Sequence, residues 1–363
     1  MVLSRGDDYP IHQTPEPVAY AGTDRNFYDR YFFNGYAPDG SGFFAVALGI
    51  YPHLDVIDAH FNVVRDGVQH CIHASAELGM ERMAMAAGPL SVEILEALNI
   101  LRIRLEPCEG MAADITFTGR AFPIEEPRFI HRIGPRAFMD YTRLTQNGGY
   151  QGWIEVDGDR RDLASGTMGT RDRSWGVRPI GARDTQPMPG HTLPGFFWQW
   201  TPVNFPQGSL FFHVNNDQHG EAWNTRAAWA GEGAGPDELA EGHGSMRTRL
   251  QQGTRWPSGG TLSLALPGAP EQVSFEPLGR FQMRGLGYTH PEWGHGMYHG
   301  RLKVAREDIE LADLDPLAPE NLHVQVPVRV TASDGSDGIG VFEQLIIGPF
   351  APLGLAEFLD GAG

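Results

Sequence analysis

The chain is almost free of lysine and poor in cysteine. Lys303 is the only lysine in 363 residues, so a Schiff base or a pyridoxal phosphate site would have to use it. It stands in an alternating stretch, residues 300–304, that predicts an exposed strand position. The two cysteines, Cys71 and Cys108, form neither a disulfide framework nor a zinc site on their own. Lysine-based covalent catalysis and a cysteine-stapled fold are therefore not expected.

Long hydrophobic runs and basic segments are missing as well. The longest strongly apolar run, residues 43–51, is too short to span a membrane, and residues 1–8 contain no apolar core of a signal peptide. The net charge of -17 and the lack of any Lys/Arg run disfavour binding to nucleic acid or to anionic membranes. We therefore expect a cytoplasmic protein that neither binds nucleic acid nor inserts into a membrane.

Helical periodicity is scarce, whereas two-residue alternation is frequent. Residues 90–98 fit a helix or a strand, but residues 101–106 alternate strictly between apolar and charged side chains. Further short strands are predicted at residues 43–50, 56–64, 114–119, 152–156, 196–200, 209–214, 222–228, 261–266, 272–278, 300–304 and 323–330. Turn signals stand at residues 66–67, 147–149, 157–158 and 334–335. This spacing predicts an all-β protein with antiparallel sandwich or barrel architecture.

A proline-rich stretch, residues 179–195, divides the chain near its middle. Its four prolines break any long strand, and each half of the chain has a suitable size for one β-barrel domain. We therefore predict an N-terminal domain of residues 1–185 and a C-terminal domain of residues 186–363.

Familiar catalytic signatures are absent, but an unusual octet stands at the midpoint. The chain has no G-x-S-x-G elbow, Walker loop, H-E-x-x-H or C-x-x-C motif, and we predict no cofactor. Residues 171–178 hold three arginines around Asp172 and Trp175. Such a combination of charged and aromatic side chains is usually stabilised by hydrogen bonds between the arginines and the carboxylate. We therefore expect Asp172 to be held by arginines of its own octet, including Arg171, at the end of an element facing a cavity. Trp175 is expected against the contact between the domains.

Residues 290–300 form a second dense segment. His295 and Tyr298 are candidate acid/base residues, and Glu292, Trp293 and His299 are candidate substrate-binding residues of a site wall. Two alternatives stay open: a tight turn with surface histidines, or a metal held by His290, His295 and His299.

Two further strands carry candidate site residues. Asp58 and His60 share the polar face of the strand predicted at residues 56–64, which faces either solvent or a cavity. Trp198 and Trp200 share one face of an aromatic strand and, with His213, either fill a core or line an apolar pocket.

Several of these segments resemble a known family. They are residues 31–35, 39–40, 51–52, 56–64, 66–70, 171–176 and 290–296. Over most of its length the chain resembles the carotenoid 1,2-hydratase (hydroxyneurosporene synthase) and AttH-like family, in which Asp172 and Trp175 fall on an Asp-x-x-Trp-Gly motif. The chain departs from the carotenoid hydratases at Arg173, where they have histidine, and at residues 198–200, where they have a Tyr-x-Asp pair.

The resemblance implies two lipocalin-like (calycin) β-barrels packed side by side, with a ligand cavity in or between them. It also implies proton-driven chemistry on a bulky hydrophobic molecule. We therefore predict a cofactor-independent lyase, of hydratase, dehydratase or retro-aldol type, that acts on a small hydrophobic or aromatic substrate such as a terpenoid, steroid or phenolic dimer. The alternatives are a non-catalytic ligand-binding protein and a histidine-ligated metalloenzyme, and the sequence leaves open whether the chain forms a homodimer.

Overall fold

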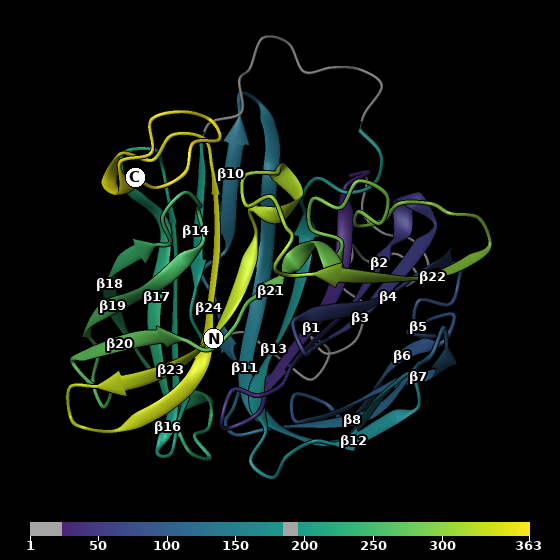
Figure 1. Ribbon diagram of the computed structural model, residues 1–363, viewed down its shortest axis with the longest axis horizontal. Coiled ribbons are helices and arrows are strands. Elements are labelled where there is room, and N and C mark those ends of the chain that lie inside the picture. Colours follow the sequence, from purple (N-terminus) through teal and green to yellow (C-terminus); the bar gives the residue numbers. More distant parts are fainter. Residues whose placement is uncertain (1–23, 184–194) are drawn as a thin grey trace.

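The computed structural model describes residues 24–183 and 195–363, which form two antiparallel sheets and several short 3₁₀ helices. Each sheet curls into a barrel-like lobe, and the two lobes lie side by side (Figure 1). The predicted all-β class with two lipocalin-like barrels is confirmed. Among the described residues, no helix has the length and apolar character needed to cross a membrane.

The first sheet has fourteen strands, and the second has ten. Those of the first sheet are β1 (Phe27–Tyr36), β2 (Phe43–Tyr51), β3 (Val56–Arg65), β4 (Val68–Glu77), β5 (Ala86–Ala87), β6 (Leu90–Glu96), β7 (Ile100–Cys108), β8 (Met111–Gly119), β9 (Ile124–Glu125), β10 (Phe129–Ile133), β11 (Arg136–Val156), β12 (Asp159–Asp162), β13 (Met168–Val177) and β22 (Leu302–Glu310). Those of the second are β14 (Phe196–Trp200), β15 (Val203–Phe205), β16 (Gly208–Asn216), β17 (Ala222–Gly231), β18 (Ala240–Leu250), β19 (Pro257–Ala265), β20 (Gln272–Pro277), β21 (Phe281–Gln282), β23 (Val324–Ala332) and β24 (Asp337–Ile347). The 3₁₀ helices are η2 (Pro52–Leu54), η3 (Pro236–Glu238), η4 (Met283–Leu286), η5 (Pro319–Asn321) and η6 (Ala351–Leu353).

Both sheets enclose apolar cores. In the first, β5 and β6 return against β3, and in the second the pairing of β23 with β24 closes the circuit. Side-chain alternation sends Ile57, Ala59 and Phe61 of β3 into the first core, whereas the neighbouring residues of β3 point outward. Residues 90–98, which fitted a helix or a strand, form strand β6 and a turn.

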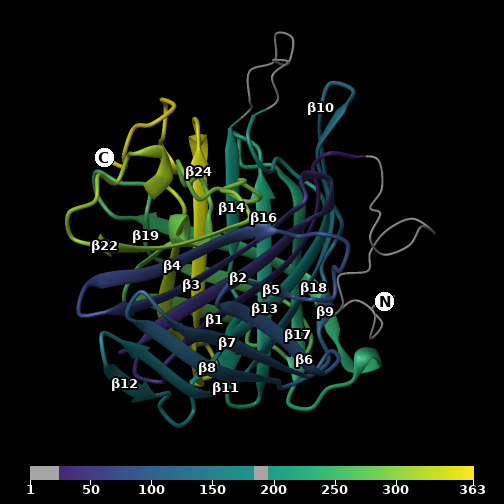
Figure 2. The ribbon, with the colours of Figure 1, turned by 90° about the vertical axis from the view of Figure 1, so that its right-hand side faces the viewer.

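The two halves of the chain are interleaved at one edge. The expected boundary between residues 185 and 186 lies outside the described residues; β13 before it belongs to the first sheet, and β14 after it belongs to the second. However, β22 comes from the second half and pairs along β4 of the first sheet, with Glu307 opposite Cys71. Figure 2 shows β22, in light green, beside β4. The segment between η4 and β22 consequently crosses the outer face of the first barrel.

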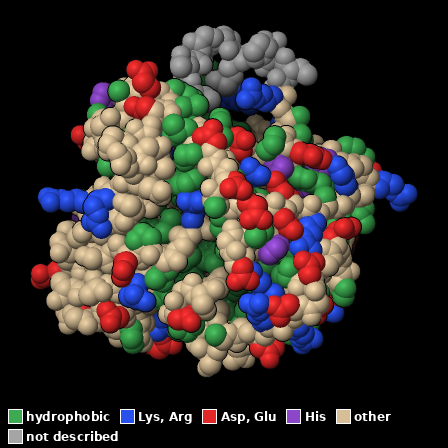
Figure 3. Space-filling model, in the orientation of Figure 1, with side chains coloured by type: hydrophobic (Ala, Val, Ile, Leu, Met, Phe, Trp, Pro, Cys, Tyr) green, Lys and Arg blue, Asp and Glu red, His purple; other side chains and the backbone are tan. Residues whose placement is uncertain are grey.

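A third apolar layer joins the barrels. It contains Phe32 and Ala47 of the first sheet together with Trp198, Trp200 and Leu345 of the second. On one face of the molecule, hydrophobic side chains gather in the furrow between the lobes (Figure 3). Strands β1 and β13, which pair with each other, are therefore covered on both faces: one face lines the first core, and the other faces the junction.

Two local predictions have different outcomes. Residues 171–177 are the last seven of the ten residues of β13, a strand paired on both sides in the first sheet, so the octet does stand at the end of an element. Residues 147–149 are not a turn, because they continue strand β11. A Cβ on Gly148 would lie 2.3 Å from the Phe117 ring. This glycine permits close packing rather than chain reversal.

Candidate active site at the domain junction

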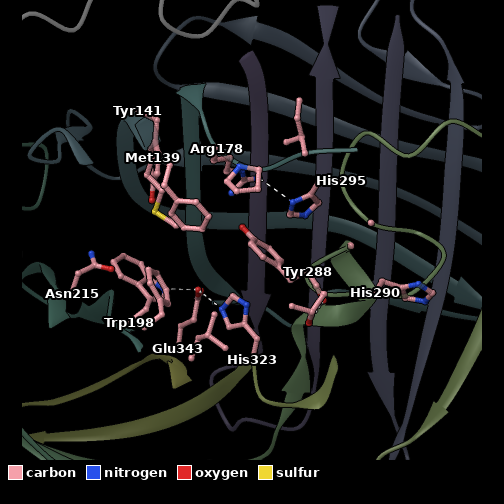
Figure 4. Close-up of a pocket in the computed structure, with 18 of the residues that line it drawn as sticks. Met139, Tyr141, Arg178, Trp198, Asn215, Tyr288, His290, His295, His323 and Glu343 are labelled. Carbon is pink, nitrogen blue, oxygen red and sulfur yellow. Dashed lines mark hydrogen bonds and ion pairs between the residues drawn. The ribbon is translucent and has the colours of Figure 1, made fainter. Parts of the chain in front are cut away.

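A cavity of about 320 Å³ opens between the two barrels. Its apolar side consists mainly of Phe138, Met139, Tyr141, Ile180, Phe196, Trp198 and Leu345, and its polar side of Arg143, Arg178, Asn215, Tyr288, His290, His295, His323 and Glu343. In Figure 4, Tyr288 lies between the Arg178–His295 pair and the His323–Glu343 pair, while Tyr141 and Met139 form the opposite wall. Aromatic walls with a few convergent polar groups are typical of ligand pockets.

Tyr288, in the segment after η4, is oriented by Arg30 of β1. The Nη1 of Arg30 donates a hydrogen bond of 2.9 Å to the phenolic oxygen, and its Nη2 donates one of 2.8 Å to the Leu286 carbonyl. Because the phenolic oxygen accepts from a cation, its own proton is left for another acceptor. The Tyr288 ring also contacts the rings of His295 and His323 edge to face, with centroids 4.5 and 4.7 Å away. Tyr288 thus presents a donor hydroxyl at the cavity.

His323 and Glu343 form a carboxylate–histidine dyad. The Nε2 of His323 lies 2.8 Å from Oε1 of Glu343, so this nitrogen carries the proton and donates it. Nδ1 of His323 is buried and has no hydrogen-bond partner among the described residues. In the neutral tautomer set by Glu343, Nδ1 holds a lone pair and is available as a base.

Glu343 itself is buried and multiply hydrogen-bonded. Trp198 donates its indole N–H to Oε1 at 2.7 Å, and Gln325 donates to Oε2 at 2.6 Å. Burial favours the neutral acid, but the hydrogen bonds from His323, Gln325 and Trp198 outweigh it and hold the pKa of Glu343 below its usual value. Glu343 is therefore ionised at neutral pH and fixes the orientation of His323.

Trp200 reaches a second buried carboxylate. Glu126 accepts hydrogen bonds from Trp200 Nε1 at 3.2 Å and from Thr145 Oγ1 at 2.6 Å, and it forms an ion pair with Arg143. Although burial opposes ionisation, Arg143 holds the pKa of Glu126 below its usual value. The guanidinium Cζ of Arg143 lies 4.8 Å from the Trp198 ring centroid, so the cation is enclosed by aromatic walls.

His295 has both ring nitrogens engaged. Nε2 lies 3.0 Å from the Leu286 carbonyl, which requires a proton on this nitrogen, and Nδ1 accepts from Arg178 at 3.2 Å. Burial and the charges of Arg30 and Arg178 hold the pKa of His295 well below its usual range. The neutral ring thus positions Arg178 and offers no free nitrogen for proton transfer.

Asp172 faces the junction, on the opposite side of β13 from its neighbouring arginines. Arg171 donates to Gln146 at 2.7 Å, and Arg173 forms an ion pair with Asp29, so the expected network within the octet is wrong. The reason is strand alternation, which places residues 171 and 173 on the face of the first core. Burial raises the pKa of Asp172 to about 7, against the opposing charges of Arg143 and Arg30.

Trp175 shares the strand face of Arg173, whose Cζ lies 5.8 Å from its ring centroid. It therefore lies on the face of β13 opposite Asp172, and the expected position of Trp175 against the interdomain contact is also wrong.

The raised pKa of Asp172 predicts a stability difference that depends on pH. Between pH 4 and 7 the folded protein keeps a proton that the unfolded chain has lost, so stability falls as the pH rises through this window. At pH 8 we expect Asp172→Asn to have a free energy of unfolding higher than wild type by about 1 to 3 kcal/mol, and at pH 4 an equal one. Urea unfolding from pH 4 to 8 measures this difference.

Asp114→Asn is the control, because its effect on stability should change with pH in the opposite direction. The hydrogen bond from Arg102 lowers the pKa of Asp114, so its contribution is lost as the pH falls rather than as it rises. A destabilised Asp172→Asn protein at pH 8 would mean that the Asp172 charge is structurally required.

Asp58 and His60 lie beneath the segment after η4 and do not line the cavity. Asp58 accepts hydrogen bonds from the Gly296 backbone N–H at 2.7 Å and the Tyr51 hydroxyl at 3.1 Å. Burial raises the pKa of Asp58 to about 6. Nδ1 of His60 lies 2.8 Å from Nδ1 of His73 on β4. This polar face is thus neither solvent-exposed nor part of a lumen, because residues 283–299 cover it.

The outer side of residues 290–299 points away from the cavity. Tyr298 is 59% exposed and bonds to Glu77. Glu292 pairs with Lys303 at 2.7 Å, and His299 approaches the backbone of Glu292. The structure therefore does not bring Tyr298, Glu292 and His299 to the site.

The inner side of this segment contacts the first barrel. Trp293 stacks on His73, with ring centroids 5.4 Å apart, and His290 approaches Glu307. The three histidines His290, His295 and His299 thus have separate partners, and the metal site considered for them is not formed among the described residues.

His213 is a buried histidine behind the cavity wall. Its Nε2 lies 2.8 Å from Asn224 Oδ1, and its Nδ1 lies 3.6 Å from Glu126. Burial lowers its pKa, so the ring is neutral and packs beside Trp198. His213 supports the wall but does not line the cavity.

The sequence patterns do not reveal most of the polar residues at the cavity. These are Arg143, Tyr288, His323 and Glu343, which line it, and Arg30 and Glu126, which hold Tyr288 and Arg143 without lining it. One signal was available: Arg30 and Glu343 interrupt strongly apolar strands, β1 and β24, where a charge needs a buried partner. Alternation alone does not show which residue, on a strand far away in the sequence, is the buried partner of each charge.

Solved structures with a similar fold span nearly the whole chain. An AttH-like protein from Nitrosomonas europaea has a TM-score of 0.54 and 14% identity, covering 93% of this chain and 98% of that one. CghA has a TM-score of 0.51 and 11% identity, with coverages of 93% and 95%. Kievitone hydratase from Nectria haematococca has a TM-score of 0.47 and 9% identity, with coverages of 92% and 93%.

At these identities, the likeness to the AttH-like protein and to CghA establishes the fold. No functionally curated protein matches the chain. A family model, described as a family of unknown function (DUF8625), matches residues 3–356. The chain therefore belongs to this family of unknown function.

Proposed function

We propose that the junction cavity is the active site of a cofactor-independent lyase that adds or removes a small group by acid/base chemistry. The observation that carries this proposal is the dyad of Glu343 and His323: both residues line the cavity beside Tyr288, and the buried Nδ1 of His323 has no hydrogen-bond partner among the described residues. Hydration and dehydration each require a general base and a proton donor at the same site, and a carboxylate that orients the base supports this role.

In the direction of hydration, His323 Nδ1 takes a proton from water while the oxygen bonds to one carbon of the alkene. Tyr288 donates its proton to the adjacent carbon, and Arg30 stabilises the resulting phenolate. The proton that His323 has gained then passes through water in the cavity to the Tyr288 phenolate, which restores both groups. Dehydration follows the same steps in reverse.

The charges at the cavity favour a substrate that develops negative charge on oxygen. Arg178 lines the cavity and contacts His295 and the rings of Tyr28 and Tyr288, and among the described residues it forms no ion pair with a carboxylate. Its Nε is buried without a hydrogen-bond partner among the described residues. An enolate or a phenolate, as formed from a phenolic substrate or in a retro-aldol cleavage, fits this cation. The aromatic walls suit a bulky, partly apolar molecule, and among terpenoids, steroids and phenolic dimers we favour the phenolic class.

Isotope incorporation tests the proposal in either direction of the reaction. The protein is incubated with phenolic and terpenoid alkenes and alcohols in D₂O or H₂¹⁸O, and the recovered compounds are analysed by mass spectrometry. We expect incorporation with wild type and a decrease of about 10²–10⁴-fold with Tyr288→Phe. Tyr298→Phe is the matched control: this exposed tyrosine lies outside the cavity, and its variant should retain the full rate.

A compound that binds stoichiometrically but shows neither isotope incorporation nor aldehyde release would identify a ligand-binding protein instead. Full activity of Tyr288→Phe would contradict the assigned proton donor.

A further inference from the structure

A second cluster of chemically active side chains lies outside the cavity, where β22 meets β4. Cys71 and His73 are two residues apart on β4 and therefore share a face, and Glu307 of β22 is directly opposite Cys71. One donor atom from each residue lies within 4.8 Å of the others. The cluster joins a strand from the second half of the chain to the barrel formed by the first half.

We propose that Cys71, His73 and Glu307 bind one divalent transition-metal ion, with Zn²⁺ as the best match. A thiolate, an imidazole and a carboxylate are the ligand types that Zn²⁺ takes in proteins, and three such ligands leave a fourth position for water. The proposal does not depend on the function assigned to the junction cavity.

The histidine in this cluster has the orientation of a metal ligand. Its Nδ1 faces His60, so Nε2 is the nitrogen that points toward Glu307, at 3.5 Å from Oε2. This Nε2 is fully buried and makes no hydrogen bond in the described part of the chain. Trp293 stacks on the ring with an interplanar angle of 13° and holds it in place. A buried, oriented nitrogen that faces a carboxylate oxygen 3.5 Å away without forming a hydrogen bond is the observation that points to a bound ion.

The surroundings supply the outer contacts that such a ligand requires. When Nε2 of His73 binds a metal, Nδ1 carries the proton and donates it to His60, whose Nε2 lies 4.0 Å from Asp58. Metal-binding histidines usually donate their second N–H in this way. Asp58 and His60 thus acquire a role as supports of His73 rather than as the acid/base pair considered from the sequence.

The carboxylate is held with one oxygen toward the cluster. Arg284 binds Oε1 of Glu307 at 2.6 Å, which leaves Oε2 for the ion. His290 donates to the same Oε2 at 3.2 Å, and a carboxylate oxygen has lone pairs for both interactions. His290 itself is not a ligand, because its Nδ1 accepts the backbone N–H groups of Glu292 and Trp293, so its Nε2 is protonated. The Glu307 side chain is 29% exposed, which provides an entry path for the ion.

Cobalt titration of the metal-free, full-length protein tests the site. We expect one equivalent of Co²⁺ to produce a thiolate-to-cobalt charge-transfer band in the near ultraviolet and to be displaced by Zn²⁺. Cys71→Ser should abolish this band, whereas Cys108→Ser, which removes the other cysteine, should retain it. Wild type without the band, or a band unaffected by Cys71→Ser, would overturn the proposal.

A second variant, at the partly exposed ligand Glu307, tests the site if Cys71→Ser fails to fold. Glu307→Gln should weaken Co²⁺ binding at least tenfold, and Glu310→Gln, three residues further along β22 and exposed, should not. Equal affinities of wild type and Glu307→Gln would exclude Glu307 as a ligand and overturn the three-residue site.

Discussion

Replacement of His323 by glutamine is expected to lower kcat by about 10²–10⁴-fold. A glutamine amide can still donate a hydrogen bond to Glu343 in place of His323 Nε2, so the buried carboxylate remains paired. It cannot accept a proton at the position of Nδ1, and the base is lost. Turnover of the substrate found by isotope incorporation measures the effect, with circular dichroism as the check of folding.

His70→Gln is the matched control for this variant. His70 also pairs with a carboxylate, Asp308, at 3.0 Å, but this pair lies at the surface where β4 meets β22. We expect wild-type kcat from His70→Gln. A His323→Gln enzyme that retains more than a tenth of the wild-type kcat would exclude His323 as the general base.

Glu126→Gln is expected to lower the free energy of unfolding by about 3–5 kcal/mol. The substitution leaves the Arg143 guanidinium buried between aromatic rings without the carboxylate that forms its ion pair. Urea unfolding at pH 7 measures the change. The same decrease in the free energy of unfolding should appear whether or not the cavity is catalytic, because it depends only on the buried ion pair.

An exposed ion pair provides the comparison. Glu232 pairs with Arg120, but its side chain is 58% exposed, so Glu232→Gln should change the free energy of unfolding by less than about 1 kcal/mol. Similar losses for both variants would show that the Glu126–Arg143 pair is hydrated in solution.

Strand positions and fold class could be predicted from the sequence because they depend on local alternation. The predicted strands at residues 56–64, 101–106 and 114–119 lie in β3, β7 and β8, whose alternate side chains point into the first core. The prediction of two lipocalin-like barrels came from the resemblance to AttH-like proteins, because alternation alone does not show how many barrels the strands form. Alternation also placed Asp58 and His60 on the polar face of β3, but it could not show what covers that face.

The candidate site depended on the tertiary structure because its members come from distant strands. His323 stands just before β23 and meets Glu343 inside the adjacent strand β24 of the second barrel, Arg30 comes from the first barrel, and Tyr288 comes from the segment that leads to β22. Strands β1 and β13 are covered on both faces, which the usual pattern of one polar and one apolar face does not anticipate. The sequence by itself therefore determined the barrels and which side chains share a strand face. The packing of one barrel on the other decided which strand faces became a core, a cavity wall or a covered polar cluster. A charged side chain on one barrel is buried only when a surface of the other covers it and supplies its partner, which the sequence of a single strand does not show.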